Sequence, residues 1–560
     1  MINSNGGYKN FEVAIYARAY EVEKMGDPDW LKTAWNTISR QVHIDKIYLE
    51  THRDLLIVDK DILRKAIDFF EGKGLKVSGG ITFTIDESNY FETFSYSDPE
   101  HRQKIQEISE YTARFFDEFI LDDFFFTNSK SDVEIEAKGD LSWTGYRLEV
   151  MKEAATELVI NPARETNPDV DIIIKYPNWY EHFQGLGFNL EEGPLLFDGI
   201  YTGTETRDRS MRNQHLQQYL GYAVYRYYDN LSGENRGGWV DPFGLNYMDR
   251  YAEQLWLTLF ARAPEITLFD IRMLVTPLNE YQDLRADWQG EGSLFDFDEM
   301  IESVKPGDAS LARAAGYSLE IVDRVIDKLG KPIGVKSYKP YHSVGEDFLQ
   351  TYFGMIGIPI DIVPQFPENE EVVILTETAS CDPDIISKIQ VHLKQGKNII
   401  VTSGLYSALQ GKGIEDIVEL RMTNRKASVR EFAIGRGDLF YSEKEMSIPQ
   451  LNYLTNDSWE VISALDDTNG WPLMHFSNYS SGKFYLWVIP DNFIDLYQLP
   501  EAVLNQLRSI IAGHLDVLLE APAEVSLFVY NNNSFVVESF LHEEVSVKIV
   551  LDKNIGQVTD

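Results

Sequence analysis

Acidic residues stand where short apolar runs of this 560-residue chain end. Asp122 and Asp123 interrupt the run Phe119–Thr127, and Glu205 follows the run Asp198–Thr204. Two such acids would be costly to bury without partners. The acid pair therefore indicates a structural ion pair or a functional site, and we favour a functional site. Adjacent residues of a strand point to opposite faces, so only one of the pair is expected to face a common site.

Two further acids occupy similar positions along the chain. Asp241 directly precedes Pro242, where a turn-forming role is the alternative, and Asp270 lies two residues before Arg272. The candidate catalytic carboxylates are Asp123, Asp122, Glu205, Asp241 and Asp270. Polar and aromatic side chains at the ends of the same runs are candidates for substrate binding: Glu50, His52, Arg53, Lys175, Tyr176, Trp179, Arg207, Trp239 and Arg272.

Paired carboxylates among aromatic rings favour hydrolysis of a glycosidic bond. One carboxyl group protonates the leaving oxygen, and the other attacks the anomeric carbon or activates water. Tyr and Trp rings pack against sugar rings, while charged side chains bind hydroxyl groups. The sequence contains no His-Glu-x-x-His, Walker or Gly-x-Ser-x-Gly motif, so we expect no metal, no cofactor and no serine nucleophile.

Two other functions remain open from the residues alone. A barrel that binds glycan or serves as an oligomeric scaffold would need no catalytic pair. A lyase or isomerase would need a metal or a Schiff-base lysine, and Lys175 is the candidate for that lysine.

The elements that must position these residues follow a regular alternation over the first 330 residues. Apolar residues in the predicted helix 54–72 recur with the spacing of one buried helix face, as at Leu63, Ala66, Ile67 and Phe70. Eight short β-branched or aromatic runs alternate with such helices: Phe11–Ala17, Lys46–Thr51, Lys76–Thr84, Phe119–Thr127, Asp171–Tyr176, Asp198–Thr204, Gly238–Phe243 and Glu265–Ile271. This count predicts a (β/α)₈ barrel, in which functional groups lie at the carboxyl ends of the strands.

A second unit is expected to begin near Lys331. Its apolar runs predict a flavodoxin-like α/β domain with strands at Ile333–Ser337, Glu371–Thr376 and Asn398–Ser403. Residues 425–480 are more irregular, with strand-like pieces, and alternating runs after Pro522 predict β-hairpins. We therefore expect a catalytic barrel at 1–330, the flavodoxin-like domain at 331–520 and a small β domain at 521–560.

Composition narrows the possible partners. Lys and Arg number 51 against 89 Asp and Glu, which gives a net charge of −38. Such a surface repels phosphate backbones and anionic lipids, so neither nucleic acid nor a membrane is expected as a partner. Cys381 is the only cysteine, which excludes a disulfide framework. The start of the chain lacks a signal-peptide pattern, so we expect a cytoplasmic protein, with export through a leader absent from this chain as the alternative.

The later part of the chain carries a family resemblance. The stretch Gly482–Phe493 (GKFYLWVIPDNF), followed by Leu519–Pro522 (LEAP) before the final hairpins, resembles the end of an amidotransferase-like domain. With the barrel before it and the small β domain after it, the chain resembles family 42 β-galactosidases. The resemblance implies a glycosidase acting on carbohydrate, a second domain without amidotransferase chemistry, and a homo-oligomer, either a dimer or a trimer.

The acidic motif differs from that of the resembling family. Family 42 enzymes have Asn-Glu at the end of strand four and Glu at strand seven, whereas this chain has Asp122-Asp123 and Asp241. In this respect the chain is similar to other barrel glycosidases, which use an Asp at strand four and an acid at strand six. That likeness implies an Asp of the pair as nucleophile and Glu205 as proton donor.

Overall fold

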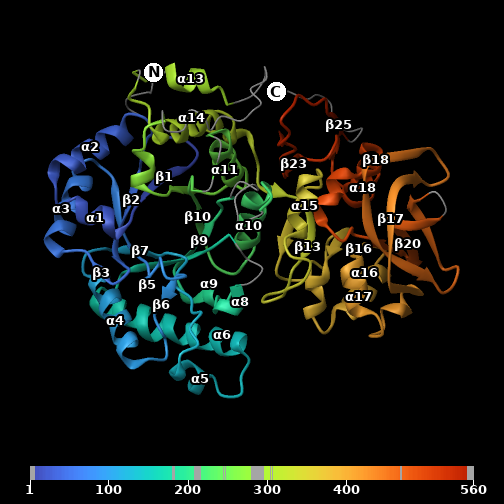
Figure 1. Ribbon diagram of the computed structural model, residues 1–560, viewed down its shortest axis with the longest axis horizontal. Helices are drawn as coiled ribbons and strands as arrows, with labels where there is room; N and C mark the ends of the chain where they lie inside the picture. Colours follow the sequence, from blue (N-terminus) through green and yellow to red (C-terminus); the bar gives the residue numbers. More distant parts are fainter. Residues whose placement is uncertain are drawn as a thin grey trace. The chain divides into compact units, whose positions relative to one another are not determined.

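The computed structural model (Figure 1) describes residues 7–178, 183–206, 216–243, 245, 248–278, 295–302, 304–305, 307–466 and 469–551. The chain divides into two compact units. The first holds the residues up to Leu216 together with Leu231–Asp327, and the second holds Gln217–Asn230 together with the residues from Lys328 onward.

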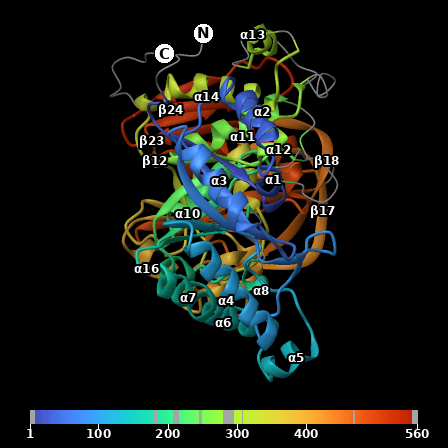
Figure 2. The same cartoon turned by 90° about the vertical axis from the view of Figure 1, so that its left-hand side faces the viewer.

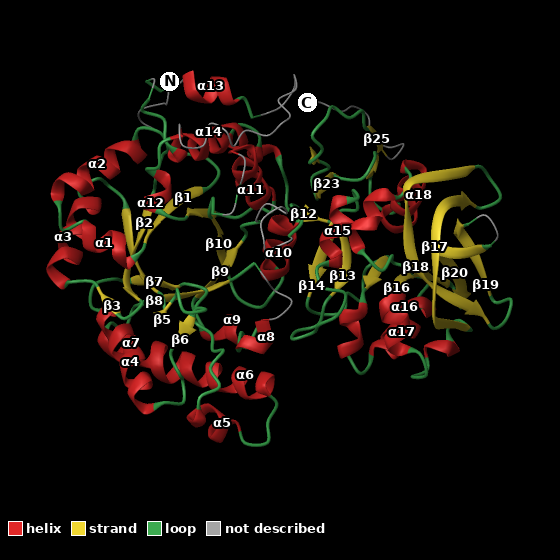
Figure 3. Ribbon diagram, viewed as in Figure 1, coloured by secondary structure: helices red, strands yellow, loops and turns green. Residues whose placement is uncertain are grey.

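Within the described residues of the first unit, eight parallel strands close into a barrel, as predicted (Figure 3). Neighbouring strands pair in the order β1-β11-β10-β9-β8-β7-β4-β2, and β1 pairs with β2 to close the ring. The barrel strands are β1 (Glu12–Ala17), β2 (Lys46–Arg53), β4 (Lys76–Ile81), β7 (Glu118–Leu121), β8 (Asp171–Tyr176), β9 (Gly199–Gly203), β10 (Asn235–Val240) and β11 (Glu265–Leu268). They are almost continuously buried because a barrel strand is covered on both faces.

Helices cover the outside of the barrel (Figure 2). In α3 (Lys60–Glu71), Asp59 caps the first turn and Leu63, Ala66 and Phe70 form the buried face. The other helices of this unit are α1 (Ala19–Lys24), α2 (Pro28–Ser39), α4 (Pro99–Ala113), α5 (Asp132–Lys138), α6 (Trp143–Ala154), α7 (Asn161–Thr166), α8 (Phe183–Leu186), α9 (Gly193–Leu196), α11 (Met248–Phe260), α12 (Ile271–Leu274), α13 (Phe297–Glu302) and α14 (Leu311–Asp323), with a π-helical turn (Ala155–Ile160) after α6 and a 3₁₀ turn (Ile326–Lys328).

The helix predicted from Asp54 begins six residues later in the structure. Asp54 and Leu55 have left-handed backbone conformations, and the short strand β3 (Leu56–Ile57) turns back onto β2. A second small hairpin, β5 (Thr84–Asp86) with β6 (Glu92–Thr93), follows β4. Both hairpins project from the carboxyl ends of barrel strands, where loops carry function in this fold.

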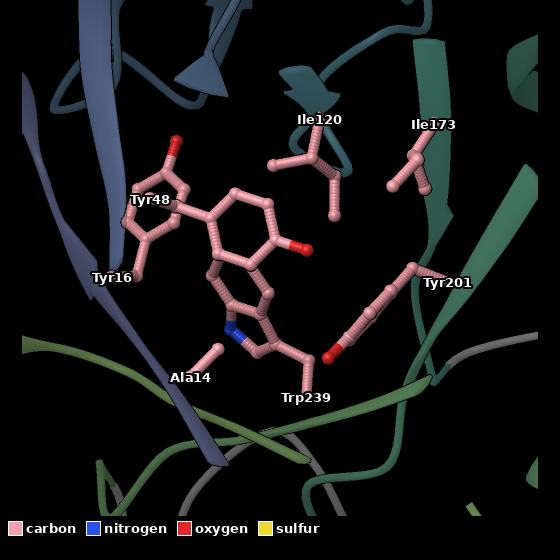
Figure 4. Close-up of a cluster of buried hydrophobic side chains, with 7 residues drawn as sticks. All are labelled: Ala14, Tyr16, Tyr48, Ile120, Ile173, Tyr201 and Trp239. Atoms are coloured by element: carbon pink, nitrogen blue, oxygen red, sulfur yellow. The ribbon is translucent and has the colours of Figure 1, made fainter. Parts of the chain in front are cut away.

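Aromatic side chains fill the barrel interior (Figure 4). The rings of Tyr16 and Trp239 lie 4.6 Å apart between centroids, and Phe269 packs against both. The cluster consists of Ala14, Tyr16, Tyr48, Ile120, Ile173, Tyr201 and Trp239. The interior is thus a packed core that separates the two ends of the barrel.

The second unit is built on one mixed sheet in the order β14-β13-β15-β16-β21-β20-β19-β17-β18. Its parallel strands are β13 (Val335–Tyr338), β14 (Ile360–Val363), β15 (Val372–Leu375), β16 (Asn398–Thr402) and β21 (Gly482–Trp487). Its helices are α10 (Leu220–Asp229), α15 (Leu349–Met355), α16 (Ile385–Lys394), α17 (Ser403–Leu409) and α18 (Glu501–Ala512), with 3₁₀ turns at Glu377–Cys381, Ile414–Asp416 and Phe493–Gln498. The α/β character predicted for this region is confirmed.

The strand-like pieces expected in residues 425–480 are strands in the structure, and they are longer and more regular than predicted. Most of the described residues in 425–480 lie in four antiparallel strands, β17 (Leu420–Ile434), β18 (Leu439–Tyr453), β19 (Ser458–Leu465) and β20 (Gly470–Tyr479). The small β part contains β12 (Pro332–Ile333) with β23 (Val525–Tyr530) and β24 (Phe535–Ser539), and β22 (Val517–Glu520) with β25 (Lys548–Leu551). None of the described helices is long and apolar enough to cross a membrane.

Candidate active site

The two adjacent acids meet one lysine at the carboxyl end of the barrel. Lys175 of β8 places its Nζ atom 3.1 Å from Asp122 Oδ1 and 2.9 Å from Asp123 Oδ2. The expectation that only one acid would reach a common site is wrong. Strand β7 ends at Leu121, so the two acids lie in the turn beyond it, where the alternation of strand faces no longer applies.

Burial and charge set the two acids apart electrostatically. Burial acts to raise the pKa of Asp122, but the charges of Lys175 and Arg53 outweigh it and hold this pKa below its usual value. Burial and the neighbouring Asp122 charge raise the pKa of Asp123 to about 6, against the opposing effect of Lys175. In many active sites, two neighbouring titratable groups have pKa values that are shifted apart, so that one acts as the acid and the other as the base.

Lys175 is the centre of positive charge in this cluster. Its Nζ atom lies 4.4 Å from the ring centroid of Trp239, in a cation–π contact. Burial lowers the pKa of Lys175, but the charges of Asp122, Asp123 and Glu205 raise it above its usual value. The lysine therefore stays protonated between the carboxylates.

Arg53, at the end of β2, contacts the oxygen of Asp122 that Lys175 does not contact. Its Nη2 atom is 2.9 Å from Asp122 Oδ2, and its Nη1 atom is 2.7 Å from Glu87 Oε2. The same guanidinium forms a bidentate pair with Glu50, at 2.9 Å and 3.0 Å. Arg53 thus joins the end of β2 to the turn that follows β7.

Glu50 has the contacts of an internal anchor. Its fully buried carboxylate accepts hydrogen bonds from the Tyr16 hydroxyl at 2.8 Å, the Ala19 amide at 2.7 Å and the Thr82 hydroxyl, besides those from Arg53. Burial raises the pKa of Glu50. These contacts take up its acceptor positions, and Glu50 holds the guanidinium of Arg53 in place.

Other predicted binding residues point away from the acids. His52 is buried beside Phe83 and Phe94, and its Nδ1 atom is 2.7 Å from the Thr82 carbonyl oxygen. Burial lowers the pKa of His52 to about 4. Tyr176 follows the inward-facing Lys175 on β8 and lines an apolar cavity outside the barrel.

The remaining acids have distinct surroundings. Glu205 is buried just beyond β9, and its charge acts on Lys175. Asp241 accepts a hydrogen bond from the Phe243 amide at 2.8 Å, the contact of a turn-forming residue. Asp270 caps α12 through the Met273 amide at 2.9 Å.

Charged neighbours also hold Asp270. Its Oδ2 atom lies 3.3 Å from Arg18 Nε and 3.2 Å from Arg272 Nη2, and burial raises its pKa. Arg272 is therefore a partner of Asp270. Trp179 and Arg207 lie outside the described residues.

Sequence reasoning missed several members of the cluster. Tyr16 occupies an inward position of β1, which strand alternation identifies once a barrel is assumed. Glu87 lies in a loop beyond β5, and nothing in its local sequence indicates a contact with Arg53. In the described part of the chain, no group of three or more His, Cys, Asp or Glu side chains could hold a metal ion.

An eight-stranded barrel with acids buried at the carboxyl ends of its strands, followed by a mixed-sheet unit, is the architecture of a multidomain barrel glycosidase. The family described as "Probable glycosyl hydrolase, catalytic domain" matches residues 3–328, and "Probable glycosyl hydrolase, C-terminal domain" matches residues 516–560. Between them, residues 330–492 match the second domain of "Uncharacterized protein SSO3021". The chain belongs to this family of probable glycosyl hydrolases, and the protein is a glycoside hydrolase.

Several proteins are similar to this chain over most of its length. "Uncharacterized protein SSO3021" of Saccharolobus solfataricus is 23% identical, with 91% of this chain and 87% of that protein covered. The β-galactosidase of Bacillus circulans sp. alkalophilus has a TM-score of 0.59 at 10% identity, covering 94% of this chain and 92% of that one. The α-L-fucosidase isoenzyme 2 of Paenibacillus thiaminolyticus has a TM-score of 0.61 at 12% identity, covering 95% and 88%. At these identities the two solved structures show the fold alone.

Proposed function

We propose that the protein hydrolyses a glycosidic bond with Asp123 and Glu205 as its catalytic carboxylates. The observation that carries this proposal is the Asp122–Lys175–Asp123 ion cluster, in which one acid stays ionised and the other has a pKa near neutral pH. Glu205 is the third acid whose charge acts on Lys175.

Asp123 is the proton donor in this proposal. A general acid works best when its pKa is near the working pH, and the pKa of Asp123 is raised to about 6. Glu205 then attacks the anomeric carbon or activates water. This assignment reverses the roles implied by the likeness to glycosidases with a strand-four nucleophile.

Asp122 and Arg53 position the reacting groups. Asp122 binds both Lys175 and Arg53, so it fixes the ammonium that faces Asp123. Arg53 is held in turn by Glu50. A preorganised cation beside the acids stabilises the negative charge left on Asp123 after proton transfer.

The Schiff-base alternative for Lys175 is disfavoured by its surroundings. An amine nucleophile must lose its proton, and lysines that act this way have lowered pKa values. The carboxylates around Lys175 raise its pKa instead. Lys175 therefore supports an electrostatic role.

The test is a screen of aryl α- and β-glycosides and natural oligosaccharides, read by released sugar. With the sugar that reacts, Asp123→Asn and Glu205→Gln are each expected to lower kcat by about 10²- to 10⁴-fold in protein that still folds. Asp61→Asn, at an exposed position in α3, is the matched amide control. Wild-type rates in both site variants would contradict the assignment, and tight glycan binding without products would favour the non-catalytic alternative.

A further inference from the structure

The β5–β6 hairpin presents two aromatic side chains to solvent. Tyr90 is 90% exposed and Phe91 is 48% exposed, and both have a left-handed backbone with φ of 53° and 58°. Non-glycine residues in this conformation cost free energy, and such strain is concentrated at functional sites. Neither aromatic ring is fully buried, so burial of these side chains does not offset the free energy of the strained backbone.

The hairpin extends directly from the catalytic cluster. The ring of Phe91 stacks on that of Phe124, with centroids 5.4 Å apart and an angle of 28° between the planes. Phe124 is the residue after Asp123, and its ring lies 5.7 Å from the guanidinium carbon of Arg53. Since Arg53 contacts Asp122, the aromatic pair lies one side chain away from the acids.

Hydrogen bonds hold the hairpin in this position. Glu87 accepts from Arg53 Nη1 at 2.7 Å, so the arginine that binds Asp122 also binds the hairpin. The carboxylate of Asp54 accepts from the Glu87 amide at 2.8 Å and the Thr84 hydroxyl at 2.6 Å. The aromatic pair is therefore preorganised relative to the acids.

We propose that Phe91 and Phe124, with Tyr90 at the rim, form a stacking subsite for the second ring of the substrate, next to the sugar whose bond is cleaved. A pyranose ring presents an apolar C–H face that packs on an aromatic ring, as does an aryl aglycone. The ligand is uncharged here, because the nearby guanidinium of Arg53 is already paired with Glu50, Asp122 and Glu87. This inference rests on the proposed function, and it names the substrate class as glycosides of at least two rings.

Substrate selectivity tests the subsite. The measured quantity is the ratio of kcat/KM for the phenyl glycoside or disaccharide to kcat/KM for the methyl glycoside of the same sugar. Phe91→Ala is expected to lower this ratio by roughly three- to tenfold, because only a two-ring substrate reaches the stacked pair. Phe91→Trp is expected to restore it, and Phe91→Leu, which lacks an aromatic face, is not.

The control is Tyr441→Ala, which removes a ring that is 59% exposed on β18 of the second unit. It is expected to leave the ratio unchanged. An unchanged ratio in Phe91→Ala, or an equal fall for both substrates, would overturn the subsite.

A binding measurement separates this inference from the hydrolytic function. If the wild type cleaves none of the glycosides, the proposed function fails, and calorimetric titration of the protein with a disaccharide and its monosaccharide still tests the subsite. Weaker disaccharide binding in Phe91→Ala, with unchanged monosaccharide binding, would support it. Equal binding by Phe91→Ala and the wild type would overturn it.

Discussion

Each end of the barrel interior holds a buried lysine that contacts carboxylates, and each of these lysines also lies over an aromatic ring of the core cluster shown in Figure 4, Lys46 over Tyr48 and Lys175 over Trp239. At the amino end, Lys46 lies 2.5 Å from Glu118 and 3.3 Å from Glu265. At the carboxyl end, Lys175 lies 3.1 Å from Asp122 and 2.9 Å from Asp123.

The two lysine networks differ in how their acids are separated. Glu118 and Glu265 come from different strands, and Glu265 also accepts from the hydroxyls of Tyr48 at 2.9 Å and Tyr201 at 3.0 Å. The acids at Lys175 are adjacent in the chain, so each affects the other's charge and their pKa values move in opposite directions. We therefore assign a structural role to the amino-end network and propose a catalytic role for the network at the carboxyl end.

Amide substitution at the two ends gives the largest expected contrast. Asp123→Asn should lower kcat by about 10²- to 10⁴-fold, because it removes the proton donor. Glu265→Gln should leave kcat of the folded protein unchanged and lower its stability. Initial rates and urea unfolding of both variants check this, and a similar loss of kcat in Glu265→Gln would break the comparison.

Replacement of each lysine tests the charge balance. Lys175→Met removes the cation paired with Asp123, and Lys46→Met removes the cation paired with Glu265, and loss of one partner of a buried ion pair costs about 3–5 kcal/mol in unfolding free energy. Only Lys175→Met should also lower kcat in the fraction that stays folded. Chemical denaturation and active-site titration measure the two effects, and equal kcat values in both variants would argue against a catalytic role for Lys175.

The pKa of Asp123 predicts a pH dependence at the carboxyl end of the barrel. The raised pKa of Asp123, about 6, means that its acid form is lost above that pH, so kcat should fall about tenfold per pH unit there. Protonation favours the folded state for a raised pKa, so the contribution of Asp123 to stability is full below about pH 4 and is lost as pH rises through 6. Carboxyl ¹³C NMR should show a resonance titrating near pH 6 that disappears in Asp123→Asn, and its persistence would contradict the assignment.

Loss of single hydroxyl groups gives the smallest expected effect. Tyr16→Phe removes the hydrogen bond to Glu50, and Tyr48→Phe removes those to Lys46 and Glu265, each at about 1 kcal/mol of stability. Tyr16→Phe should also lower kcat a few-fold, because Glu50 holds Arg53. Thermal melts and kcat values of Tyr16→Phe and Tyr48→Phe measure the two effects. An unchanged kcat in Tyr16→Phe would show that the hydrogen bond from Tyr16 to Glu50 does not contribute to catalysis.

Local sequence was sufficient to predict the strands of the barrel. The eight barrel runs predicted from their apolar character are strands in the structure, because burial on both faces leaves a continuous apolar run. The acids of the cluster were also found from the sequence, since charged residues at the end of an apolar strand are rare unless they are paired or functional.

Tertiary structure alone determined which side chains meet. Arg53 contacts Asp122 across 69 positions of the chain, and Lys175 contacts it across 53. Helix α10 follows β9 in sequence but belongs to the second unit, where Asn230 binds Asp361 at 2.8 Å. Such contacts depend on strand register and on where each strand ends.

The acid pair shows this division most clearly. Its residue types and its place after an apolar run are properties of the sequence, and they indicated a site. Whether one or both acids would face the barrel depended on β7 ending at Leu121, which hydrogen bonding with the neighbouring strands β4 and β8 decides. Periodicity is a local property of a chain, whereas the partner of a buried charge is decided by the strands that surround it.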